Sequence, residues 1–91
     1  MALQELPRYS AEEAARRGDE IYERDIRPLV EAQNRGKVVA IDVESGAYIV
    51  GENALIASER LLAERPSAEI WCVRVGSRAL RHIGHAGSAT A

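Results

Sequence analysis

Residues 36–50 (GKVVAIDVESGAYIV) carry the hydrophobic pattern of a β-hairpin. Val39, Ile41 and Val43 alternate with their neighbours, and a period of two places such side chains on one face of a strand. The turn is predicted at residues 44–46, where Gly46 can adopt a positive φ angle, and the second strand follows at residues 48–50. We expect the rest of the chain to pack on this hairpin.

A long amphipathic helix is predicted before the hairpin, from Ser10 to about residue 35. Ser10 and Glu13 form a capping box, in which the serine side chain accepts a hydrogen bond from the amide three residues later. Acid–base pairs four residues apart, each worth about 0.2–0.5 kcal/mol, support this helix. They are Glu12–Arg16, Glu13–Arg17, Glu20–Arg24, Glu23–Arg27 and Glu31–Arg35.

The apolar stripe of this helix has small residues in its first turns and large ones later. Its members are Ala11, Ala14, Ala15, Gly18, Ile21, Tyr22, Ile26, Leu29 and Ala32. Small residues permit close approach, so the candidate partner-binding residues are Ala11, Ala14, Ala15, Gly18 and Tyr22. They would face another protein or a second copy of the chain. The alternative is that they lie flat on the chain's own second helix.

Pro28 interrupts the helix, because it lacks the amide that would bond to the Arg24 carbonyl oxygen. We therefore expect a kink or break at residues 25–27. Asp25 falls within the apolar stripe, where a charge needs a partner. Pairing with an arginine, or capping of the segment that Pro28 begins, is favoured over a functional carboxylate.

A second helix is predicted between Asn53, its N-cap, and Pro66, which ends it. The side chains expected on its inner face are Leu55, Ser58, Leu61 and Leu62. A third strand follows at residues 68–75, and residues 78–83 are the candidate for a fourth.

These elements define an α+β fold, an N-terminal helix followed by a split β-β-α-β unit. We expect an antiparallel sheet of three strands in the order 2-1-3, or of four strands, with both helices on one face. The predicted domain covers residues 10–83, between an N-terminal extension at residues 1–9 and a flexible tail at residues 84–91. The predicted core consists of Val39, Ile41, Val43, Leu55, Leu62, Trp71, Val73 and Val75.

Composition narrows the class of protein without naming a function. The 91 residues are 46% hydrophobic and 29% charged, which is typical of a globular domain, and the net charge of −2 creates no field for nucleic acid or anionic lipid. No apolar run of transmembrane length and no signal peptide is present. With one cysteine there is no intramolecular disulfide, and we expect a cytoplasmic protein.

Two short motifs imitate catalytic signatures. Residues 41–46 (IDVESG) resemble the first metal motif of proofreading-type exonucleases, but no aspartate follows Asp42 to complete a two-metal site. Asp42 and Glu44 are therefore interpreted as the solvent-facing edge of a hairpin. Residues 82–85 (HIGH) spell the signature of class I aminoacyl-tRNA synthetases, yet only six residues follow and no nucleotide-binding helix can form.

Neither the cysteine nor the arginines near the C-terminus form a convincing site. Cys72 alternates within a strand and has no nearby catalytic base, so it is interpreted as a small buried hydrophobe. Arg74, Arg78 and Arg81 lack the interleaved aromatic residues of a single-strand nucleic-acid platform.

Three blocks carry a resemblance: residues 8–31 (RYSAEEAARRGDEIYERDIRPLVE), 36–50, and 57–76 (ASERLLAERPSAEIWCVRVG). In this order they resemble a family of small bacterial proteins of unknown function, common in cyanobacteria and encoded beside small retropepsin-like aspartic proteases. The resemblance implies a compact α+β domain with an antitoxin-like or protease-partner role, and it supplies no catalytic residue. The family ends in an aromatic, glycine-rich segment, from which residues 80–85 (LRHIGH) depart.

The leading functional expectation is a non-enzymatic protein–protein interaction module, without cofactor, metal or membrane association. It would bind another protein or itself through the first helix. The alternative is a nucleic-acid-associated regulator that uses Arg74, Arg78 and Arg81. A metal-dependent hydrolase built on Asp42 and Glu44 is a distant third.

Overall fold

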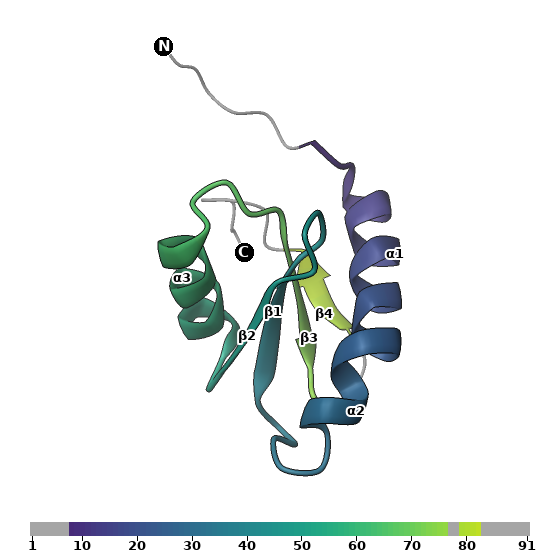
Figure 1. Cartoon of the computed structure of the whole chain (residues 1–91), viewed down its shortest axis with the longest axis vertical. Helices are drawn as coiled ribbons and strands as arrows, with labels where there is room; N and C mark the ends of the chain where they lie inside the picture. The colour runs from purple at the N-terminus through teal and green to yellow at the C-terminus, as the bar shows by residue number, and fades with distance from the viewer. Residues whose placement is uncertain (1–7, 77–78, 83–91) are drawn as a thin grey trace.

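The computed structural model describes residues 8–76 and the backbone of residues 79–82 (Figure 1). Its elements in chain order are α1 (Ala11–Ile21), the π-helical segment η1 (Tyr22–Ile26), α2 (Arg27–Val30), β1 (Val38–Asp42), β2 (Tyr48–Gly51), α3 (Ala54–Glu64), β3 (Ile70–Arg74) and β4 (Ala79–His82). The strands form one antiparallel sheet in the order β2-β1-β3-β4. The predicted α+β fold and the 2-1-3 order are confirmed, and a fourth strand lies within residues 78–83.

The helices lie on opposite faces of the sheet, so the prediction of both helices on one face is wrong (Figure 1). The segment α1–η1–α2 covers the face that carries Val39 and Ile41, and α3 covers the face that carries Val38 and Ala40. Every residue of β1 is buried. Because both sets of alternating residues in β1 are apolar, each face requires a covering layer. The result is a three-layer sandwich.

The π-helical segment explains why Leu29 is exposed to solvent and Val30 is not. The Arg27 amide donates to the Tyr22 carbonyl oxygen, five residues back, directly before Pro28. One extra residue in a turn rotates everything after it by about 100°. Val30 is consequently 6% exposed and belongs to the core, whereas Leu29 is 72% exposed. The predicted interruption of the α-helix before Pro28 is confirmed in the form of this π-helical segment, but the predicted stripe is wrong at Leu29.

Helix α3 begins at its predicted N-cap, where the Asn53 side chain accepts a hydrogen bond from the Ile56 amide at 2.9 Å. Its buried residues are Ala57, Ser58 and Leu61. Leu55 is 66% exposed, so its assignment to the core was wrong, and Leu62 packs at the margin of the core. The other predicted core residues are confirmed as buried: Val39, Ile41, Val43, Trp71, Val73 and Val75.

The chain before α1 already contacts the sheet. Arg8 donates from Nη2 to the Ser67 carbonyl oxygen at 3.0 Å, and Tyr9 packs at the core margin with the Arg17 guanidinium over its ring. Two residues that were assigned to an N-terminal extension therefore contribute contacts to the domain. The predicted tail, residues 84–91, lies outside the described residues. Within the described part, no helix is both long and apolar enough to cross a membrane.

Candidate functional site

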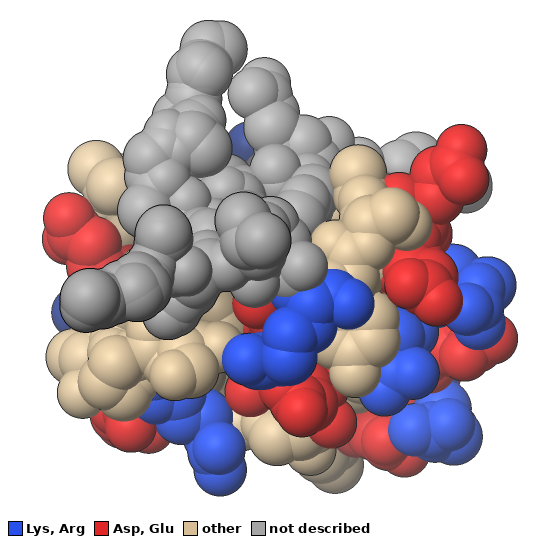
Figure 2. All heavy atoms as spheres, turned by 90° about the horizontal axis from the view of Figure 1, so that it is seen from above, with Lys and Arg blue, Asp and Glu red and all other residues tan. Residues whose placement is uncertain are grey.

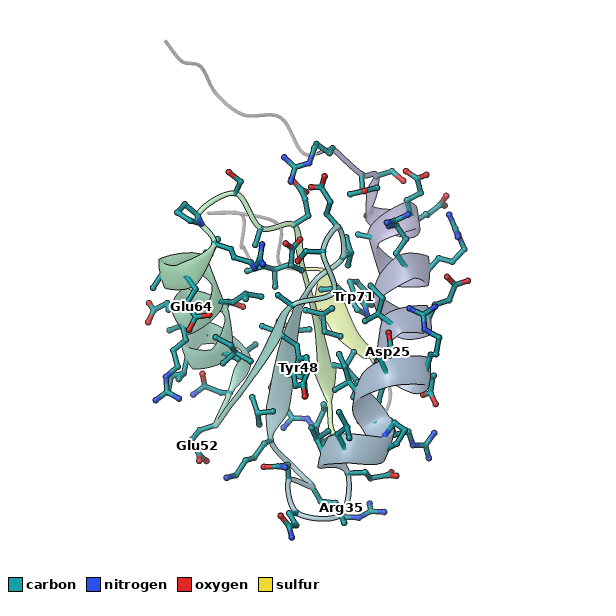
Figure 3. The ribbon with its side chains drawn as sticks, viewed as in Figure 1. Asp25, Arg35, Tyr48, Glu52, Glu64 and Trp71 are labelled. Carbon is teal, nitrogen blue, oxygen red and sulfur yellow. The ribbon has the colours of Figure 1, made fainter. Side chains whose placement is uncertain are left out.

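On the small-residue face of the first helix, Gly18 packs against Trp71 of the chain's own strand β3. A Cβ atom at Gly18 would lie 2.6 Å from Cγ and 2.8 Å from Cβ of Trp71. The Trp71 indole nitrogen donates to Asp19 Oδ1 at 3.1 Å, and Figure 3 shows the side chain between the sheet and α1. The close approach that small residues permit is thus used inside the domain.

This packing determines which of the predicted partner-binding residues are accessible to a partner. Ala14 is 0% exposed, Tyr22 is 4% exposed and Gly18 is buried, which removes these three from any partner surface. Ala11 is exposed and Ala15 is half-buried. The alternative that this face rests on the second helix is also wrong, since α3 lies on the other side of the sheet.

Asp42 ties the hairpin turn to the start of β3. Its Oδ1 accepts from the amides of Glu44 at 3.1 Å and Glu69 at 3.2 Å, and its Oδ2 accepts from Ser45 Oγ at 2.8 Å. The residue is 4% exposed, so the predicted solvent-facing position is wrong for Asp42. Both carboxylate oxygens are occupied by the protein itself, which argues for a structural role.

Glu44 is exposed and forms an ion pair with Arg8. These two residues, with Asp42, Ser45 and Ser67, help to line an open cleft of about 490 Å³ between the hairpin turn and the segment before β3. Of the charged side chains that line it, Arg8 and Glu44 pair with each other, and Glu64 and Arg65 lie at its margin without an ion pair among the described residues. No three His, Cys, Asp or Glu side chains of the described residues come together where they could hold a metal ion.

Asp25 lies on the surface and pairs with the adjacent Arg24. Arg24 donates from Nε and Nη2 to the two Asp25 carboxylate oxygens at 3.0 and 2.9 Å. These hydrogen bonds hold the pKa of Asp25 below its usual value. The interpretation as an arginine-paired residue is confirmed.

Cys72 is buried on the α3 face, with its Sγ 3.4 Å from Ser58 Oγ. Burial raises the pKa of the thiol, so the reactive thiolate is disfavoured. The prediction of a small buried residue is confirmed.

Of the arginine cluster, Arg74 donates from Nη1 to the Gly36 carbonyl oxygen at 3.0 Å. The side chains of Arg78 and Arg81 lie outside the described residues, as does most of the HIGH motif at 82–85. The view from above shows acidic and basic side chains interleaved on the α1 side, with no continuous region of one sign there (Figure 2). The nucleic-acid alternative therefore stays a prediction.

An unpaired sheet edge is the feature that sequence reasoning missed. Among the described strands, β2 has a neighbour on one side only. The Asp42 amide donates to the Ala47 carbonyl oxygen at 2.8 Å, and bonded pairs alternate along an antiparallel ladder. The bonded partners in β2 are therefore Ile49 and Gly51. The amide and carbonyl groups of Tyr48 and Val50 therefore point away from β1, toward the open side of β2.

Apolar side chains lie on the α1 face of the sheet at this edge and in the helical layer above it, and we call the group the β2-side surface. It comprises Tyr48, Val50 and the outward backbone of β2, together with Ile21 and Leu29 of the helical layer that covers the same face; its side chains are half-buried except Leu29, which is exposed. The strand YIVG contains no charge and no proline, the usual protections of an edge. The sequence carried this signal in the uncharged run at residues 46–51.

Comparison of the chain with family models, with curated proteins and with solved structures finds no match. The resemblance to the cyanobacterial-type family thus stays a prediction.

Proposed function

We propose that this chain is a protein–protein interaction module that binds through the β2-side surface. The carrying observation is the edge of β2, where outward backbone groups lie beside apolar side chains and no described strand pairs with them. Exposed edges of this kind recruit another strand, because main-chain hydrogen bonds supply affinity and alternate side chains supply specificity.

Two further features support a binding role. The π-helical segment turns Leu29 outward, in the helical layer over the face that carries Tyr48 and Val50, so this leucine adds to the apolar side chains of that face. The groups that first suggested chemistry are meanwhile engaged internally: Asp42 by three hydrogen bonds and Cys72 by burial.

The resemblance to proteins encoded beside retropepsin-like proteases makes such a protease, or a toxin-like protein, the first heterologous partner to test. An antitoxin-like or protease-regulating role would follow from that partner. Nothing in this proposal requires a cofactor or a metal.

The test is affinity purification of the tagged chain from its own host, comparing wild type with Leu29→Glu and Leu55→Glu. Both leucines are exposed, at 72% and 66%, but only Leu29 belongs to the β2-side surface. We expect a specific protein to accompany wild type and Leu55→Glu and to be lost with Leu29→Glu, while circular dichroism shows all three folded. A partner retained equally by all three would contradict the proposed surface.

A further inference from the structure

We infer that the β2 edge pairs with the β2 edge of a second copy of this chain, so that two sheets join into one. This inference rests on the proposed function and names the partner. Identical edges related by a two-fold axis must run antiparallel. The only outward backbone groups of β2 belong to Tyr48 and Val50, so an axis through Ile49 pairs Tyr48 of one copy with Val50 of the other.

This register brings no like charges together along the strands. Ala47 faces Gly51 of the second copy, and Gly46 faces Glu52, whose carboxylate already lies 3.6 Å from Lys37 of its own chain. Tyr48 and Val50 form aromatic–aliphatic cross-strand pairs on one face, while Ile49 meets its own counterpart on the other. The edge is therefore complementary to itself.

The spacing of α3 fits the same axis. Helix α3 packs on β1 and β2. With strands about 4.8 Å apart, it lies about that far from an axis at the outer edge of β2. The two copies of α3 would then run antiparallel about 10 Å apart, close to the 8–10 Å of packed helices.

The height of the axis along α3 follows from the contact between Gly51 and Ala57. A Cβ atom at Gly51 would lie 2.9 Å from the Ala57 amide nitrogen, so these residues are level. Ile49 lies two residues farther along the strand, about 6.6 Å, which corresponds to about four residues of helix. The axis therefore passes near Leu61 and Leu62.

An axis at that height sets Arg60 opposite Glu64 of the second copy, and Glu64 opposite Arg60. Ala57, Arg60 and Glu64 are spaced as one stripe of α3, and Ala57 fixes this stripe on the β2 side. Figure 3 shows the position of Glu64 on α3. Arg60 and Glu64 are exposed, and neither pairs with another of the described residues. Two reciprocal ion pairs would satisfy all four charges.

Charge reversal of the full chain tests the inference, with mass measured by sedimentation equilibrium. Wild type is expected to be a dimer. Arg60→Glu places like charges opposite each other twice, so its dissociation constant should rise about tenfold. The double variant Arg60→Glu/Glu64→Arg should restore the wild-type value. Glu59→Arg, a reversal of an exposed residue outside the Ala57–Arg60–Glu64 stripe, is the matched control and should not change it.

Hydrogen exchange supplies a second readout that does not depend on charge. The amides of Tyr48 and Val50 should be protected in the dimer and exchange rapidly in Arg60→Glu at concentrations where it is monomeric. A monomeric wild type overturns the inference, as does a dimer indifferent to both Arg60→Glu and the restoring pair. If wild type is monomeric while Leu29→Glu still abolishes capture of another protein, only the second-copy partner is refuted and the proposed function stands.

Discussion

Gly18 shows how one residue decides what a helix face can do. Its hydrogen atom occupies the place where any larger side chain would meet the Trp71 indole. A stripe of small residues is compatible with a partner helix or with an internal aromatic ring, and only the position of Trp71 distinguishes the two. Residue types alone could not, because Trp71 lies 53 positions along the chain from Gly18.

Gly18→Ala should lower the melting temperature, although alanine is favoured over glycine within a helix by about 1 kcal/mol. The added methyl group must displace the indole ring, and such overpacking costs about 1–3 kcal/mol. In a Trp71→Ala background the same substitution should become neutral or stabilising. Chemical denaturation of the four proteins measures the coupling; additivity of the two changes would contradict the contact.

Asp42 raises the second question at the scale of residues, namely whether its carboxylate is structural or binds a metal, because residues 41–46 resemble a metal-binding motif. Asp42→Ala leaves the amides of Glu44 and Glu69 without their acceptor, so we expect a loss of about 2–3 kcal/mol. Asp42→Asn keeps one carbonyl oxygen as an acceptor and should lose less. Thermal unfolding with and without Mg²⁺ measures both effects. A melting temperature raised by Mg²⁺ in wild type, but not in Asp42→Asn, would point back to a metal site.

At the scale of elements, the helices and strands along the chain and both N-caps were predictable because each rests on local spacing. The period of two in β1, the positive φ of Gly46 and the caps at Ser10 and Asn53 need no distant contact. The alternating pattern did not predict the face on which α3 packs. Val38 and Ala40 are apolar, as Val39 and Ile41 are, so the pattern does not distinguish the two faces of β1. The sequence did not predict which residues after the π-helical segment face the core, since Pro28 can bend a helix in several ways.

The rotation of the helix after the π-helical segment yields a direct prediction about Val30 and Leu29. Val30→Ala should lower the free energy of unfolding by about 1–2 kcal/mol, because the side chain is 6% exposed and its removal leaves a cavity. Leu29→Ala should change it by less than about 0.5 kcal/mol, although leucine is the larger residue. Denaturant titration of the two variants is sufficient. The opposite order would mean that a regular α-helix continues through Pro28.

At the scale of the whole molecule, the sandwich leaves few directions for association. Helical layers cover both faces of the sheet, so a further strand can be added only at an edge, β2 or β4 (Figure 1). Of these, β2 is the edge whose side chains are described, and it bears no charge. We therefore expect association at the uncharged edge of β2, not at the first-helix face that the sequence favoured.

Association through β2 has a consequence for the stability of the entire chain. A folded dimer in equilibrium with unfolded monomers gains stability with concentration, because binding to the folded state alone shifts the equilibrium by mass action. For a chain of this size, each tenfold rise in protein concentration should raise the melting temperature by about 3–5 °C. Arg60→Glu should show a smaller dependence over the same range, and the restoring pair Arg60→Glu/Glu64→Arg should recover it. Calorimetry at several concentrations provides the measurement, and a wild-type melting temperature that does not move with concentration contradicts the joined sheet.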